Sequence, residues 1–469
     1  MRFCQLNRFL SLLMIGFTLL FTQTLWAEST IPKKAPTFLI IKKEPLTVNG
    51  KTVMRYRIEQ PDGTWGYEGK EGEFFNVIVK NQTDTPTVLH WHGLVLPNNQ
   101  DGVPNITQPP IPPGGQYHYY FKLNQAGTYW MHSHYQLQLQ DQLAAPLIID
   151  PAQPDPLPAQ SVVMLMSDFS YQDPETIFAH LRQGMNMKGM SMAKMSQKPD
   201  LNDVQYDALL TNGKTLSHPQ IVTVKPGQWV RLRLIDGAAA TNFFIHLGAL
   251  SGQLMAVDGE AIHPLHQSDF TLIMGQRLNI LVKIPEGEGA YPILAQGEGS
   301  TLQTGLILAT KAAAIPTIPE KNKQAAGAVT MTQELSLHAL APLSDKPVNR
   351  HLTVTLAGNM MDYRWTLNGK VWPEYTPLEG ETGQRVEMVF TNTTGMSHPM
   401  HLHGHVFEVT KISGHPVAQG ALHDTVLVPP HGSVTIVFDA NNPGNWMIHC
   451  HVLYHAEGGM MGIYSEKNK

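Results

Sequence analysis

The sequence is poor in cysteine, in charge and in long hydrophobic stretches. Two cysteines among 469 residues exclude a fold held together by several disulfide bonds. Charged residues make up 15% of the chain, the net charge is -5, and the sequence has no lysine- and arginine-rich run, so nothing favours nucleic acid as a partner. Glycine (39) and proline (34) are plentiful and separate short runs of Val, Ile, Thr and aromatic residues. That pattern is typical of short strands and turns.

One long apolar run stands at the N-terminus. Two arginines precede FLSLLMIGFTLLF, and a small residue, Ala27, follows it. This arrangement predicts a signal peptide over residues 1–27, and a periplasmic or secreted protein with no stable membrane association after cleavage. The alternative is an uncleaved membrane anchor, for which the apolar core is short. Cleavage would remove Cys4 and leave Cys450 as the sole thiol of the chain, which a bound metal would protect from oxidation.

Three segments resemble one another, at residues 71–93, 226–248 and 382–404. Each starts at a glycine turn, passes through an alternating strand and reaches a histidine 18 or 19 residues later. A second unit recurs at 114–134 and 431–451, where a glycine is followed by histidines 17 and 19 residues on; the middle part of the chain has no histidine at those two places. The chain therefore holds three related β units.

These repeats predict an all-β protein of three β-sandwich domains, because short strands with frequent turns close a core between two sheets. Stretches with the composition of linkers mark the joints. We expect domain 1 at residues 31–151, domain 2 at 152–315, a linker at 316–333 and domain 3 at 334–469.

Four His-x-His pairs occur in the first and third repeats. They are His90/His92, His132/His134, His401/His403 and His449/His451. Residues i and i+2 of a strand point to the same face, so each pair offers two imidazoles on one side. A single pair is most often ordinary surface or core histidine, and a Cys-x-His could belong to a zinc site. Four pairs at matching repeat positions favour copper, and eight imidazoles suit a cluster of three coppers shared by the first and third domains.

Cys450 lies between His449 and His451, and on a strand it points away from both. One strand can therefore serve two metal sites that are joined by a few covalent bonds.

Further potential ligands for the thiolate lie nearby. His455 and Met460 follow Cys450, and His398 comes from another loop. Two imidazoles, one thiolate and a weak thioether are the ligands of a blue electron-transfer copper. We interpret Met461, one position further on, as a bystander.

At these residues the sequence resembles the multicopper oxidases, the family of laccases, ascorbate oxidase and bacterial copper-resistance oxidases. The motifs are HWHG (90–93), HSH (132–134), HPMHLHGH (398–405) and HCHVLYHAEGGM (449–460). The resemblance implies three cupredoxin-like Greek-key domains and four copper ions. By that resemblance type 1 copper is held by His398, Cys450, His455 and Met460, type 2 by His90 and His401, and the type 3 pair by His92, His132, His134, His403, His449 and His451.

The resemblance also implies the reaction. Four one-electron oxidations of a donor at type 1 copper would be coupled to reduction of dioxygen to water, with electrons passing through Cys450 to His449 and His451. Asp101, in NNQDGVPN, matches a family acid near the cluster, although Asp-Gly is also a plain turn signal. A second family acid directly follows the type 1 histidine, where this chain has alanine, and Glu457 stands one position later.

The substrate is suggested by a methionine-rich segment, GMNMKGMSMAKMSQ (184–197). Its methionines are Met185, Met187, Met190, Met192 and Met195. Thioethers favour Cu(I), and residues 167–181 and 356–372 resemble the copper-resistance branch, so we expect a Cu(I) site here and oxidation of Cu(I) in copper tolerance. Methionine is also a flexible side chain that fits many surroundings without binding a metal. If these methionines do not bind Cu(I), the alternative is a broad-specificity, laccase-like phenol or metal-ion oxidase. A copper-sequestering binding protein is the third possibility, but sequestration needs no Cys–His electron path.

Overall fold

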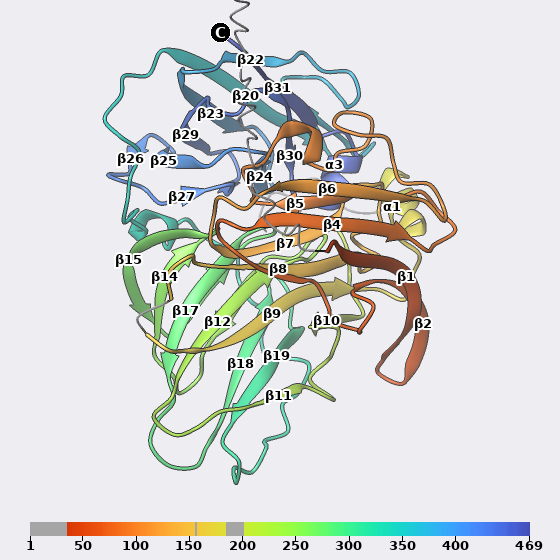
Figure 1. Cartoon of the computed structure of the whole chain (residues 1–469), viewed down its shortest axis with the longest axis vertical. Helices are drawn as coiled ribbons and strands as arrows, with labels where there is room; N and C mark the ends of the chain where they lie inside the picture. The colour runs from red at the N-terminus through yellow and green to blue at the C-terminus, as the bar shows by residue number, and fades with distance from the viewer. Residues whose placement is uncertain (1–34, 155–156, 184–200) are drawn as a thin grey trace, which may run out of the picture. The chain divides into compact units, whose positions relative to one another are not determined.

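The computed structural model describes residues 35–154, 157–183 and 201–469 (Figure 1). The predicted signal peptide and the methionine-rich segment 184–197 lie outside the described residues. Contacts join Pro36–Lys469 into one unit. Within the described ranges, no helix has the length and hydrophobicity needed to cross a membrane.

Six sheets are formed in the described chain, two in each of three successive stretches (Figure 1). In the first stretch the strand orders are β2-β1-β4-β6 and β3-β8-β7-β5. Its strands are β1 (Thr37–Val48), β2 (Lys51–Glu59), β3 (Tyr67–Lys70), β4 (Phe74–Asn81), β5 (Leu89–His92), β6 (Gln116–Lys122), β7 (Gly127–Ser133) and β8 (Ala144–Asp150), with a 3-10 turn η1 (Asn98–Gln100) after β5.

The middle stretch has the strand orders β10-β9-β12-β17-β14-β15 and β11-β19-β18-β13-β16. Its strands are β9 (Gln160–Phe169), β10 (Ala208–Thr211), β11 (Gln220–Thr223), β12 (Trp229–Asp236), β13 (Phe243–His246), β14 (Gly252–Val257), β15 (Glu260–Gln267), β16 (Asp269–Leu272), β17 (Arg277–Lys283), β18 (Ala290–Gly297) and β19 (Gln303–Ala309). Helix α1 (Pro174–Arg182) follows β9, and its first turn is capped by Asp173, which accepts a hydrogen bond from the Glu175 amide.

The last stretch has the strand orders β21-β20-β23-β29-β25-β26, with β27 beside β25, and β22-β31-β30-β24-β28. Its elements are β20 (Arg350–Asn359), β21 (Arg364–Leu367), β22 (Leu378–Glu381), β23 (Arg385–Asn392), β24 (His398–Leu402), β25 (Phe407–Ile412), β26 (His415–Pro416), β27 (Leu422–His423), β28 (Thr425–Val428), β29 (Ser433–Asp439), β30 (Gly444–Cys450), α3 (Leu453–Glu457) and β31 (Met461–Lys467). A 3-10 turn η2 (Glu334–Ser336) precedes them.

The sequence repeat is also a repeat of topology. Strand β4, β12 or β23 follows the glycine turn in each stretch, and each pairs in parallel with the strand that opens its stretch, β1, β9 or β20. Each also pairs antiparallel with the strand that follows the second glycine turn, β6, β17 or β29. We call the three stretches the first, middle and third repeats. The predicted all-β architecture of three sandwiches is confirmed, whereas the residue at which one domain ends stays a prediction.

Alternation explains why these segments are strands. In β4, FFNVIVKN, the side chains of Phe75, Val77 and Val79 are fully buried, and the intervening residues are at least partly exposed. Burying each such side chain contributes about 1.5–3 kcal/mol, so the pattern fixes which face packs between the two sheets.

Candidate metal centres

Strands β5 and β7 of the first repeat and β24 and β30 of the third repeat bring the eight paired histidines together. Across the two repeats, the ring of His90 stacks on that of His403 and the ring of His92 stacks on that of His401, each with centroids 3.8 Å apart. The two rings within each His-x-His pair lie between 4.7 and 5.9 Å apart, on one side of the chain as the alternation predicts. The predicted meeting of the first and third repeats is confirmed.

Several sets of these histidines could hold a metal ion. Potential ligand nitrogens within 4.8 Å of one another are offered by His134, His403 and His449, by His90, His92 and His132, and by His90, His401 and His403. The ring of His451 lies 5.0 Å from that of His92 and 5.4 Å from that of His132.

The imidazoles are oriented by hydrogen bonds on their outer nitrogens. The Nδ1 atoms of His90, His132 and His401 donate to the carbonyl oxygens of Asp101 (2.9 Å), Ser133 (3.0 Å) and Asp424 (2.8 Å). The Nε2 atoms of the same three rings are buried and have no hydrogen-bond partner. Because a ring that donates through one nitrogen carries its lone pair on the other, these inner nitrogens are ready to bind a metal. The cluster therefore fits copper.

Burial and mutual proximity also keep the rings neutral. Burial, followed by neighbouring histidines, holds the pKa well below the ordinary value of 6.5 in His92, His132, His134, His403 and His451. The same causes lower the pKa of His449 to about 3. The neutral form is the one that binds metal ions.

A second site lies around Cys450. Its Sγ lies 3.6 Å from His398 Nδ1 and 3.8 Å from His455 Nδ1, and the two Nδ1 atoms are 3.2 Å apart. All three side chains are fully buried. Burial raises the pKa of the Cys450 thiol, so a bound metal would be needed to hold it as thiolate. The donor set of one sulfur and two imidazole nitrogens fits copper.

The two methionines after the thiol lie differently. Met460 is fully buried, and its carbonyl accepts a hydrogen bond from the Cys450 amide at 3.1 Å. Met461 pairs with His449 between β30 and β31 and lines a cavity of about 30 Å³ beside His134, His449 and His451. Met461 therefore lies on the cluster side, which supports its interpretation as a bystander at the thiol site.

Two acids predicted from the sequence lie beside the cluster. Asp101 is fully buried, and its Oδ2 accepts a hydrogen bond from His403 Nδ1 at 2.9 Å. Glu457 lines the 30 Å³ cavity with His134. Burial, with a smaller contribution from Glu175, raises the pKa of Glu457 to about 7. Their role in proton delivery stays a prediction.

Two further acids at the sites were not predicted from the sequence. Asp424 Oδ1 accepts a hydrogen bond from His92 Nε2 at 3.0 Å. Burial raises the pKa of Asp424, but the Arg277 guanidinium and the neighbouring histidines outweigh burial and hold it well below its usual range. Asp203 Oδ2 accepts from His455 Nε2 at 2.9 Å.

The signals for these two acids were weak. Asp424 follows a histidine in LHDTVLV, and Asp203 stands just after the methionine-rich segment. In the sequence alone, each looks like an ordinary aspartate at a strand edge or in a loop, and its contact with a histidine becomes visible only when the repeats are packed together.

Aromatic rings cover the thiol site. The ring centroid of Trp365 lies 4.0 Å from that of His455 and 5.3 Å from that of His398. Tyr363 donates a hydrogen bond to Asp203. These groups keep bulk water from the sulfur, as a thiolate metal site requires.

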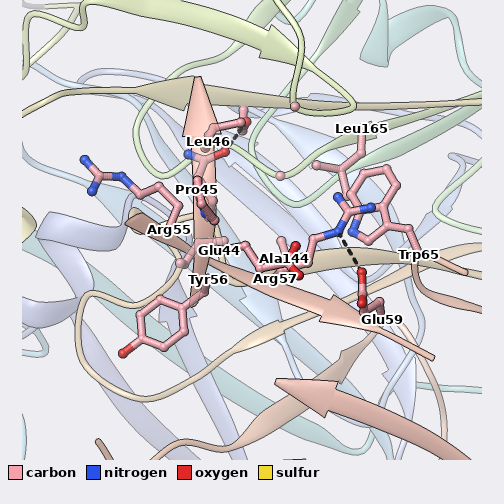
Figure 2. A pocket seen from close by; sticks show the side chains of 15 residues that line it. Glu44, Pro45, Leu46, Arg55, Tyr56, Arg57, Glu59, Trp65, Ala144 and Leu165 are labelled. Atoms are coloured by element: carbon pink, nitrogen blue, oxygen red, sulfur yellow. Dashed lines mark hydrogen bonds and ion pairs between the residues drawn. The ribbon is translucent and has the colours of Figure 1, made fainter. Parts of the chain in front are cut away.

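A larger pocket lies elsewhere, between β1, β2 and the start of the middle repeat (Figure 2). It holds about 220 Å³, and Arg57 lies over the ring of Trp65 and 3.8 Å from Glu59. None of the residues that line it is His, Cys or Met, so among the described residues the metal-binding chemistry lies away from this pocket.

Comparison with known proteins assigns the family. Models described as multicopper oxidase match residues 42–154, 160–315 and 345–469. The multicopper oxidase MmcO of Mycobacterium tuberculosis is 33% identical over 401 residues, which cover 83% of this chain and 78% of that protein. The chain belongs to the multicopper oxidase family. Copper resistance protein A of Escherichia coli is 26% identical over 524 residues, covering 83% of this chain and 86% of that protein.

Solved structures of the family share the fold. Laccase from Botrytis aclada matches with a TM-score of 0.77 at 23% identity, over 92% of this chain and 87% of that one. The cupredoxin-like domains, the copper cofactor and the family predicted from the sequence are thereby confirmed. As a multicopper oxidase, the chain is an oxidoreductase that uses dioxygen as acceptor.

Proposed function

We propose that this multicopper oxidase oxidises Cu(I) in copper tolerance, in the periplasm or outside the cell. The donor would give up electrons at a type 1 site of His398, Cys450, His455 and Met460. Oxygen would be reduced at a cluster with His90 and His401 at type 2 and with His92, His132, His134, His403, His449 and His451 at type 3. Copper bound in these sites would accept electrons singly and pass four of them to dioxygen.

One structural relationship carries this proposal. Cys450 Sγ faces His398 and His455, while the imidazoles of its chain neighbours face the histidine cluster; His449 Nε2 lies 3.1 Å from His403 Nε2 and 3.3 Å from His134 Nε2. A few covalent bonds of β30 thus separate a donor-side site from an oxygen-side site. A protein that merely stores copper has no need of that connection.

The chain's own residues supply the remaining requirements. The carbonyls that accept from the outer nitrogens hold the imidazoles in one orientation, which would limit the reorganisation of the ligands when bound copper changes its oxidation state. Asp101, hydrogen-bonded to His403, and Glu457, in the 30 Å³ cavity, would supply the protons that reduction of dioxygen consumes.

Three observations favour Cu(I) as donor. Copper resistance protein A homologues are similar over most of their length. The five methionines of segment 184–197, which lie outside the described residues, come shortly before Asp203 in the chain. Asp203 Oδ1 is buried with no hydrogen-bond partner, next to the His455 ring that the other oxygen contacts, and a carboxylate there favours a cationic donor.

The sites are tested by metal content and colour. Elemental analysis of copper-loaded protein should give four coppers per chain. Cys450→Ser should abolish the blue absorption and leave three. A blue Cys450→Ser preparation, or wild type with far fewer than four coppers, would contradict the assignment.

The donor is tested by deleting residues 184–197 and measuring steady-state oxidation of Cu(I) and of a bulky phenol separately. Loss of the Cu(I) rate with an unchanged phenol rate is expected. Two unchanged rates would favour the broad-specificity, laccase-like phenol or metal-ion oxidase. Oxygen uptake without peroxide release would exclude a copper-sequestering binding protein.

A further inference from the structure

The middle repeat, which contributes no histidine pair, reaches the cluster at the turn before β17. Gly275 in this turn has φ of +87°, and a Cβ built on it would lie 3.0 Å from His451 Cδ2 and 3.1 Å from His92 Cε1. Both the left-handed backbone and the close approach require glycine. The backbone of the middle repeat therefore packs directly against two of the imidazoles.

Two residues further on, Arg277 joins all three repeats. It is 1% exposed, and each of the five N–H donors of its guanidinium has an acceptor. Nε donates to the carbonyl of Thr128 (3.1 Å). Nη1 donates to the carbonyl of Gly275 (3.2 Å) and to Asp424 Oδ1 (2.8 Å), and Nη2 donates to the carbonyl of Asp258 (2.8 Å) and to Asp424 Oδ2 (2.6 Å). Thr128 belongs to the first repeat and Asp424 to the third. The ion pair with Asp424 is bidentate, the geometry in which arginine is most selective and lysine cannot replace it.

Asp424 in turn orients two imidazoles. Its Oδ1 accepts from His92 Nε2 at 3.0 Å, and its carbonyl accepts from His401 Nδ1 at 2.8 Å. The nitrogens left for a metal, His92 Nδ1 and His401 Nε2, are buried without a partner. An acceptor on the outer nitrogen fixes the tautomer and the ring orientation of a metal-binding histidine and raises its basicity. The Asp424 carboxylate therefore orients His92, and the carbonyl of the same residue orients His401.

We propose that Arg277 is a positioning residue for the copper cluster: its bidentate pair with Asp424 holds the residue whose carboxylate orients His92 and whose carbonyl orients His401. This inference rests on the proposed assignment of these histidines as ligands. The middle repeat thereby takes part in the oxygen-side chemistry although it carries none of the ligands.

The other repeats supply an internal comparison. The seventh residues of β4, β12 and β23 pair with Gln116, Arg277 and Ser433 respectively. The equivalents of Arg277 in the two histidine-bearing repeats are thus neutral and cannot form a charged bidentate pair. The arginine occurs only in the middle one of these three equivalent positions, in the repeat that packs against the cluster without carrying a histidine pair.

The test substitutes Arg277→Lys, which keeps the charge and most of the volume but loses the fork geometry. Arg233→Lys is the matched control. Arg233 is 6% exposed, lies in β12 of the same repeat and also hydrogen-bonds Thr128, but its ion pair is with Asp150 instead of Asp424. Both variants are copper-loaded beside the wild type. Copper per chain is then measured after dialysis against a competing chelator, along with the blue absorption and the electron paramagnetic resonance of the copper not bound by sulfur.

Arg277→Lys should keep the blue absorption, bind the cluster coppers about 10- to 100-fold more weakly, and change the resonance of the copper not bound by sulfur. Arg233→Lys should match the wild type. If Arg277→Lys is less stable, the two variants are compared by the rise in Tm on copper loading. A smaller rise than in Arg233→Lys supports positioning, because ligand binding stabilises the native state by an amount that grows with the logarithm of the affinity.

Equal copper content, equal resonance and an equal rise in Tm for the two variants would overturn the inference and leave Arg277 a structural residue. If the wild type itself holds fewer than four coppers, the proposed function fails and this inference fails with it. Four coppers in the wild type, with all three readouts equal in the two variants, would overturn this inference and leave the proposed function standing.

Discussion

Asp203 Oδ2 lies 2.9 Å from His455 Nε2, so a carboxylate of the middle repeat accepts a hydrogen bond from the outer nitrogen of a thiol-site histidine. The Asp203 side chain is 1% exposed. The contact joins residues 252 positions apart in the chain. It fixes the ring whose Nδ1 faces Cys450 and places a carboxyl group beside the proposed donor site.

Asp203→Asn should lower kcat/KM for Cu(I) by about 10- to 100-fold, because the charge is lost and the imidazole loses its strongest acceptor. A bulky phenol, which gains less from the charge, should be affected less. Steady-state oxygen uptake with each donor measures this. Asp207→Asn, a nearby exposed position that accepts from Tyr171 N, is the control and should leave both rates unchanged. Equal losses for the two donors would contradict attraction of a cation.

The axial ligand can be assigned with two neighbouring methionines. Met460→Leu should keep the blue colour and raise the reduction potential of the thiolate copper, because a thioether donates electron density that favours the oxidised ion. A tenfold change in preference for the reduced ion is about 59 mV for a one-electron couple. Spectroelectrochemical titration measures it. Met461 is also buried but lies on the cluster side, so Met461→Leu should leave the reduction potential of the thiolate copper unchanged. A shift in Met461→Leu alone would reverse the assignment.

Gly93, the last residue of HWHG, makes room for the Arg277–Asp424 pair. Gly93 has φ of +92°, and a Cβ built on it would overlap Arg277 Nη2 and lie 2.7 Å from Asp424 Oδ2. Gly93→Ala should therefore cost about 3–5 kcal/mol of folding free energy, as expected when a buried ion pair is broken, and weaken cluster copper.

Gly72→Ala separates backbone strain from overlap. Gly72 has φ of +87° but nothing within 4 Å of its Cβ position, so about 1–2 kcal/mol is expected from strain alone. Denaturant unfolding of both variants and their copper content give the comparison. Equal destabilisation would mean that Gly93 serves backbone conformation and not the ion pair.

The clustering of the proposed ligand histidines could be predicted from the sequence because alternation acts locally. His-x-His on a strand puts two rings on one face whatever the rest of the chain does, and Cys450 between two histidines must face the other way. The internal repeat then indicated that distant pairs converge. These inferences needed no knowledge of how the sandwiches pack.

Asp424, Arg277 and Asp203 could not be predicted in the same way. Each acts across repeats, and the contact between Arg277 and Asp424 spans 147 positions with no pattern in between. A signal did exist at Arg277, which opens the strand RLNILVK, where a buried charge needs a partner.

A buried ionic group between the middle and third repeats predicts a pH dependence of stability. His423 Nδ1 donates to Asp258 Oδ2 at 2.9 Å and Nε2 to Glu334 Oε1 at 3.0 Å. Burial alone lowers the pKa of His423, but the Glu334 and Asp258 carboxylates outweigh it and raise that pKa to about 10. The folded protein therefore keeps a proton on His423 that the unfolded chain loses near pH 6.5.

The sign of the effect follows from this raised pKa. Stabilisation by protonated His423 is fully present below about pH 6.5 and is lost, by up to about 1.4 kcal/mol per pH unit, as the pH rises through about 10. The wild type should therefore be more stable than His423→Gln at pH 6.5, and this difference in stability should shrink as the pH rises to 10. The urea midpoints of the two copper-free proteins measure it. His246→Gln is the control: its pair with Asp269 is exposed and should contribute at most about 1 kcal/mol. A wild-type advantage over His423→Gln that stays constant to pH 10 would mean that the folded protein holds no extra proton in this group, and would contradict the raised pKa of His423.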